Sequence, residues 1–139
     1  MKVQLTRKAS FSAAHRLYSP HLSEEENQEI YRKCGNPHGH GHTYRLEVTI
    51  EGEIDPRTGM LMNLEDLDQV IETEIISKVD HQHLNYDVPF LHDVIPTIEN
   101  LVVVFWSLLE KQFPPGALKK VVLWETDKSY VTYFGPSSL

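Results

Sequence analysis

The sequence predicts an α+β domain in which two amphipathic helices cover one face of a four-stranded antiparallel sheet. Two patterns predict this class. Apolar and polar residues alternate over residues 2–16 and 43–50, which is the period of a half-buried strand, whereas two later segments repeat apolar residues every three to four positions, as helices do. The element order is then strand, strand, helix, helix, strand, strand, and one-sided helices pack on a sheet.

The first two strands are expected at residues 2–16 and after the glycine-rich stretch 34–42. The first strand places a run of mostly apolar residues on one face: Val3, Leu5, Ala9, Phe11, Ala13 and His15. In the second strand the apolar face carries Tyr44, Leu46, Val48 and Ile50, and its phase runs back to His40 and His42. Three histidines are therefore predicted on the buried faces of two strands.

The helices are expected after Asn63 and after Thr97, which are both suited to cap a helix. A hairpin is predicted over residues 118–134 around a turn at 127–129. Residues 22–33 begin with Ser23 and Glu26 at capping-box spacing, which indicates an inserted surface helix. The open edges of such a sheet favour assembly, because a neighbouring copy can continue the strand ladder.

Length and composition predict one domain spanning residues 1–139, since 40% hydrophobic residues in 139 can bury a single core. The net charge of -7 argues against a nucleic-acid surface. We find no signal-peptide pattern and no run approaching the ~20 apolar residues of a membrane span, so we expect a cytoplasmic protein without membrane contact. The single cysteine, Cys34, excludes an intrachain disulfide.

A zinc site is the chemistry that the histidines favour. A catalytic zinc ion typically takes three protein ligands and leaves a fourth position open. His40 and His42 point the same way in a strand, close enough to bind one ion, and an antiparallel neighbour would bring His15 beside them. The alternative is that the histidine-glycine run is a solvated loop without a metal.

Other candidate residues have a functional and a structural interpretation. Cys34 could be a thiolate near a metal or a small core residue. Asp80 could orient His81 for proton transfer, or both could face water. Glu125 could pair with a guanidine-like heterocycle or end a strand in solvent, while Thr97 and Glu99 could simply start a helix. The histidines at positions 21, 83 and 92 are interpreted as surface residues.

Six motifs in order resemble the 6-pyruvoyl-tetrahydropterin synthase family, which also covers the 6-carboxy-tetrahydropterin synthases. They are FSAAHR at 11–16, Cys34-x5-His40-Gly-His42, GEIDPRTGM at 52–60, DHQHLN at 80–85, PTIEN at 96–100 and ETD at 125–127. Together they span nearly the whole chain, and the resemblance implies the tunnelling fold. In that fold sheets from several subunits close a barrel, usually as a homohexamer built from two trimers with active sites between subunits.

The resemblance also implies a reaction. The substrate would be 7,8-dihydroneopterin triphosphate, from which triphosphate is eliminated as the side chain rearranges to a pyruvoyl group, in tetrahydrobiopterin biosynthesis. His15, His40 and His42 would bind zinc, and Cys34 would be the base. Asp80 and His81 of a neighbouring subunit would relay its proton. Glu125 would anchor the pterin ring, in a pocket also lined by the motif that contains Thr97 and Glu99.

Three alternatives remain open in the sequence. The product could be the 6-carboxy compound of queuosine biosynthesis, although the Cys34-to-His40 spacing and the acidic insertion favour the pyruvoyl branch. His38 allows a shorter register in which it and His40 would be ligands, whereas counting back from Gly52 favours His40 and His42. A non-catalytic metal-binding module would need neither Cys34 nor Glu125. Arg16 and Lys33 flank the proposed site as candidates for binding the triphosphate.

Overall fold

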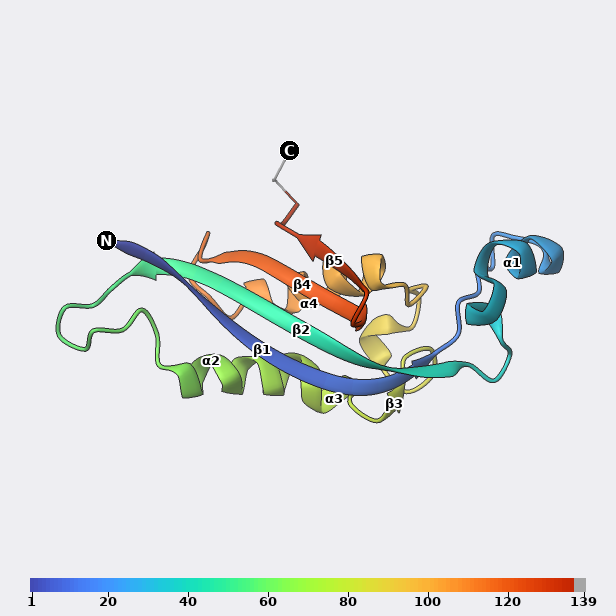
Figure 1. Ribbon diagram of the computed structural model, residues 1–139, viewed down its shortest axis with the longest axis horizontal. Coiled ribbons are helices and arrows are strands. Elements are labelled where there is room, and N and C mark those ends of the chain that lie inside the picture. The colour runs from blue at the N-terminus through green and yellow to red at the C-terminus, as the bar shows by residue number, and fades with distance from the viewer. Residues whose placement is uncertain (137–139) are drawn as a thin grey trace.

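The fold is built on a ladder of two long strands, in a computed structural model that describes residues 1–136. Strand β1 (Lys2–His15) pairs antiparallel with β2 (His40–Glu53) along its whole length, from Lys2 opposite Glu53 to His15 opposite His40. Strands β4 (Leu118–Thr126) and β5 (Ser129–Tyr133) continue the sheet beyond β2. The strand order is β3-β1-β2-β4-β5 (Figure 1).

The prediction of four strands was wrong, because β3 (Gln82–His83) adds a fifth. This strand runs parallel to the end of β1, beside Ala13 and Ala14. It is held by two backbone bonds, from His81 N to Ser12 O at 2.6 Å and from Leu84 N to Ala14 O at 2.8 Å. Two residues carry no periodicity, so the sequence gives no sign of this strand. The α+β class and the mostly antiparallel sheet are confirmed.

The two predicted helices are present, and the first is interrupted. Helix α2 (Leu64–Ile71) continues through a π-helical turn (Glu72–Ile76) into the short α3 (Ser77–Val79). The wider turn brings two consecutive residues, Ile75 and Ile76, into the core. Helix α4 (Ile98–Glu110) begins at Thr97, whose hydroxyl accepts a hydrogen bond from Asn100 N at 3.2 Å.

One hydrophobic cluster joins the helices to a single face of the sheet. Its largest buried side chains come from β2, α2 and α4, and include Tyr44, Leu46, Leu67, Phe105 and Leu109. The alternate residues of β1 and β2, such as Ser10 and Arg45, lie outside this cluster. His15, His40 and His42 lie on the same face of the two strands as this core.

Helix α1 (Glu24–Tyr31) lies beyond the end of the sheet where β1 ends and β2 begins (Figure 1). It starts with a complete capping box, because Glu26 N donates to Ser23 Oγ and Ser23 N donates to Glu26 Oε1. A 3-10 turn (Arg32–Gly35) then carries Cys34 back toward β2. Within residues 1–136, no helix is long and apolar enough to cross a membrane.

Candidate metal centre and its surroundings

Three histidine rings meet where β1 ends and β2 begins. His15 and His40 are direct cross-strand partners, and His42 lies two residues along β2. The ring centroids are 4.9 Å apart for His15 and His40, 5.0 Å for His15 and His42, and 4.7 Å for His40 and His42. One nitrogen from each ring lies within 4.8 Å of the others. This spacing lets three nitrogens surround one ion.

Burial favours the neutral form of two of these imidazoles, His15 and His42. Desolvation lowers the pKa of fully buried His15 to about 4, and it also lowers the pKa of His42. The Nε2 atoms of His15 and His42 are buried without any hydrogen-bond partner. Leaving a buried polar atom unpaired is costly, and three converging imidazoles are a common donor set for zinc. The residues present therefore fit a zinc ion.

His15 is oriented by a contact that the sequence analysis did not predict. Its Nδ1 lies 2.9 Å from the carbonyl oxygen of Pro96, and the hydroxyl of Tyr44 lies 3.3 Å from the same nitrogen. Because a carbonyl can only accept, the proton of this bond sits on Nδ1, which leaves the Nε2 lone pair facing the other two histidines. The only sequence signal for the contact between His15 and Pro96 was that Pro96 directly precedes Thr97.

Cys34 lies close enough to Tyr44 and Glu125 to interact with them electrostatically. It is half-buried, and its carbonyl oxygen accepts a hydrogen bond from Leu17 N at 2.7 Å. Burial, and then the negative charge of Glu125, raise the pKa of the Cys34 thiol. The protein groups around Cys34 thus favour the protonated thiol, so any thiolate needs a positive charge or a base beside it.

Glu125 comes at the end of β4, beside the histidine cluster. It lines an open cavity of about 500 Å³ together with Gly41, His42, Thr43, Arg45 and the two residues that follow it. Its charge raises the pKa of His42, against the larger effect of burial. The carboxylate therefore borders the same histidine that faces the proposed metal position.

Asp80 and His81 form a linked pair at the end of β1. Asp80 Oδ1 accepts from Ser12 N at 2.9 Å, and Asp80 Oδ2 lies 3.1 Å from His81 Nδ1. The bond from Ser12 N is the largest cause that lowers the pKa of Asp80. His81 has a left-handed φ of 61° and is 81% exposed. Such a backbone is costly for a residue other than glycine, and here it holds the imidazole out toward solvent.

His81 of this pair borders a groove of about 510 Å³ that also reaches His42. His81 lines it along with His83, Ser12 and Thr43. Thr97 and Glu99 are placed differently: the Thr97 hydroxyl caps α4 and Glu99 is exposed in its first turn. Both are tied to the cluster only through Pro96. Within one chain, then, Glu125 lies near His42, and Cys34 lies near Glu125 and Tyr44.

The expectation that His83 is a plain surface residue was wrong. The ring is half-buried in the groove and packs against Tyr86 at a tilt of 35°, with 4.5 Å between centroids. Its Nδ1 accepts a hydrogen bond from Asn85 N. Its Nε2 would lie 2.8 Å from a Cβ on Gly39, which has a φ of 75°. His38, by contrast, is exposed, and among residues 1–136 the cluster that can hold a metal uses His40 and His42.

Known proteins are similar to this chain over nearly its whole length. The family described as 6-pyruvoyl tetrahydropterin synthase matches residues 4–136. The 6-pyruvoyl tetrahydrobiopterin synthase of Homo sapiens is 51% identical over 134 residues, covering 96% of this chain and 92% of the human one.

The Drosophila melanogaster protein of the same name is 46% identical over 97% of this chain and 81% of its own length. The solved structure of Caenorhabditis elegans 6-pyruvoyl tetrahydropterin synthase superposes with a TM-score of 0.92 at 39% identity, covering 98% of this chain and 97% of that one. The resemblance seen in the motifs is confirmed: the chain belongs to the 6-pyruvoyl tetrahydropterin synthase family.

Proposed function

We propose that the chain is a zinc-dependent 6-pyruvoyl-tetrahydropterin synthase, a carbon-oxygen lyase. It would eliminate triphosphate from 7,8-dihydroneopterin triphosphate and rearrange the side chain, in tetrahydrobiopterin biosynthesis in the cytoplasm. The observation that carries this proposal is the set of three converging imidazoles, two with unpaired buried nitrogens, beside Cys34 and Glu125 in a member of this family. The relatives named 6-pyruvoyl tetrahydrobiopterin synthase support the same reaction.

His15, His40 and His42 would hold the zinc ion. When bound, zinc would act as a Lewis acid that acidifies the hydroxyls of the substrate side chain. The chain prepares this site in advance, because the Pro96 carbonyl fixes the tautomer of His15 and the cross-strand pairing fixes the spacing of His15 and His40. Little reorganisation of the protein is needed on binding, which is the usual advantage of a preformed site.

Cys34 would remove protons from the substrate side chain through its Sγ. Its raised pKa makes the resting group a thiol, so the proton must first leave Sγ. The Asp80 and His81 pair of a neighbouring subunit would accept it: Asp80 Oδ2 holds His81 Nδ1, which leaves Nε2 of His81 to take the proton. The exposure of His81 suits a group that acts on a second chain.

Glu125 would bind the pterin ring, because a carboxylate can accept two parallel N–H bonds from the guanidine-like edge of that heterocycle. Thr97 and Glu99 would complete the pocket. Two strand edges favour the expected homohexamer, a dimer of trimers: the outer side of β1 is paired only at Ala13 and Ala14 among the described residues, and β5 ends the sheet.

Product analysis by mass after incubation with 7,8-dihydroneopterin triphosphate tests this proposal. We expect the pyruvoyl product from the wild type and none from Cys34→Ala, which should still bind zinc. The 6-carboxy product would instead assign the chain to the queuosine branch. Binding of zinc without any binding of pterin would favour the non-catalytic metal-binding module.

A further inference from the structure

A second polar cleft lies between α1 and the turn that leads to β2. It has a volume of about 240 Å³, and Arg16 and Arg32 contribute its positive charges. Its other lining residues are Tyr18, Glu24, Asn27, Gln28, Gly35, Asn36 and Pro37. Arg16 directly follows the metal-site residue His15, and Gly35 directly follows Cys34. Two residues of the cleft thus directly follow His15 and Cys34 in the chain.

The guanidinium of Arg16 is held in place with most of its donors free. Its Nε donates to the carbonyl of Gly35 at 3.2 Å, and its Cζ lies 4.5 Å above the centre of the Tyr18 ring. Tyr18 is itself fixed, because its hydroxyl donates to Glu24 at 3.0 Å. A guanidinium has five N–H donors, and within residues 1–136 the four on the terminal nitrogens have no acceptor. This is a preoriented fork of the kind that binds phosphate in two parallel bonds.

Arg32 supplies the second positive charge of the cleft, from a position with an unusual backbone conformation. It ends α1 with a φ of 53°, a left-handed conformation that a residue with a Cβ rarely adopts. Its exposed side chain forms no ion pair or hydrogen bond with another described side chain. The sequence had suggested Lys33 beside Arg16, whereas the cleft is lined by Arg32. The carboxylate of Glu24 is the only negative side chain in the lining.

We propose that this cleft binds the polyphosphate chain of the substrate, with Arg16 as the main contact and Arg32 as the second. The inference rests on the proposed function for the identity of the anion. A protein with a net charge of -7 needs a local concentration of cations to bind a polyanion, and the Arg16 fork provides it one residue from His15. Glu24, held by Tyr18, limits how far the anion extends toward α1.

Inorganic triphosphate is the probe, titrated calorimetrically into the zinc-loaded protein. Replacing the fork in Arg16→Gln should weaken binding about tenfold or more, since hydrogen bonds between charged groups are the strong ones. Arg16→Lys should recover only part of that loss, because it keeps the charge without the fork. Arg32→Gln should lose less than Arg16→Gln. The matched control is Arg57→Gln, an exposed arginine in the turn after β2, which should bind triphosphate as the wild type does.

A gain of affinity separates the proposal from simple misfolding. Glu24→Gln removes the negative charge and keeps an acceptor for Tyr18, so it should bind triphosphate more tightly than the wild type. Direct contact of triphosphate with zinc would contribute equally to every variant and leaves these differences intact. Equal binding by Arg16→Gln and Arg57→Gln would overturn the proposal, even where the pyruvoyl product is still formed. Loss of triphosphate binding in Arg16→Gln would uphold the anion site even where that product is absent.

Discussion

The two ends of the β1–β2 ladder carry cavities of nearly equal size and opposite chemistry. At one end His15 pairs with His40, and the adjoining groove measures about 510 Å³. At the other end, beside the Lys2 and Glu53 pair, a cavity of about 520 Å³ opens between the sheet and the segments 112–117 and 61–62. Volume alone does not distinguish them.

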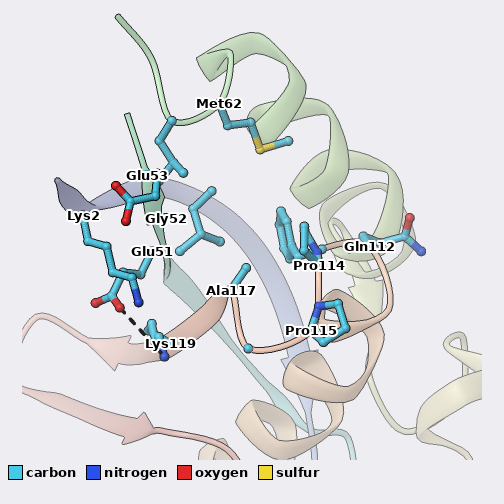
Figure 2. A pocket seen from close by; sticks show the side chains of 14 residues that line it. Lys2, Glu51, Gly52, Glu53, Met62, Gln112, Pro114, Pro115, Ala117 and Lys119 are labelled. Atoms are coloured by element: carbon cyan, nitrogen blue, oxygen red, sulfur yellow. Dashed lines mark ion pairs between the residues drawn. The ribbon is translucent and has the colours of Figure 1, made fainter. Parts of the chain in front are cut away.

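Their polar atoms do distinguish them. Figure 2 shows the second cavity, where Met62, Pro114, Pro115 and Ala117 form apolar walls and Lys119 lies 4.0 Å from Glu51 in an ion pair at the rim. Its charged groups lie at the surface, in contact with water. At the histidine end, buried nitrogens lack any partner in the protein. The comparison teaches that unpaired buried polar atoms indicate a ligand better than the size of a cavity does.

The largest effect should come from removing one of the three imidazoles. In His15→Ala one metal ligand is lost, so zinc affinity should fall by more than about 100-fold, as expected when a catalytic zinc keeps only two of its three protein ligands. Competition with a chromophoric chelator measures this. Retention of stoichiometric zinc at wild-type affinity would break the distinction between the two ends.

The matched change at the far end should affect stability and not metal. Phe113 is 7% exposed in the floor of the second cavity, and Phe113→Ala should lower the free energy of unfolding by about 3 kcal/mol. Urea denaturation gives that number, and the chelator assay should give the wild-type zinc affinity. A parallel loss of zinc would mean that the two ends are not independent.

Glycine substitutions sharpen the contrast further, because glycines with a left-handed backbone lie near both ends. Gly39 has a φ of 75° and Gly59 a φ of 73°. Either residue changed to alanine should cost about 1 kcal/mol of strain. Only at Gly39 would the new Cβ lie 3.0 Å from the carbonyl of His15, so only Gly39→Ala should also weaken zinc binding. Equal zinc affinities in the two variants would contradict this.

The smallest effect concerns acid stability near the histidine end. Because hydrogen bonds lower the pKa of Asp80 below its ordinary 3.8, this group stabilises the fold above that pH. The contribution should disappear as the pH falls through the lower folded pKa. Asp80→Asn should therefore be less stable than the wild type at neutral pH, with the difference shrinking below about pH 4. A difference that stays constant down to pH 2 would count against the Ser12 and Asp80 bond.

Local patterns predicted well what depends on neighbouring residues. The Ser23 and Glu26 capping box, the caps at Asn63 and Thr97, and the shared face of His40 and His42 all follow from spacing within one element. The bond between His15 and Pro96 joins residues 81 positions apart, and no periodicity encodes it. The same holds for β3 and for the half-buried His83. The unpredicted parts are contacts between residues far apart in the sequence, which no local pattern encodes.

Because His15 lies directly opposite His40, the three-histidine arrangement depends on the register between β1 and β2. Moving β1 by a single residue along β2 would turn His15 away from the core and separate it from its partners. Only chains that have aligned these strands correctly could then capture the ion. The amount of metal bound during refolding would therefore report the fraction of molecules with the correct strand register. A bound ion would also stabilise that register relative to one shifted by a residue.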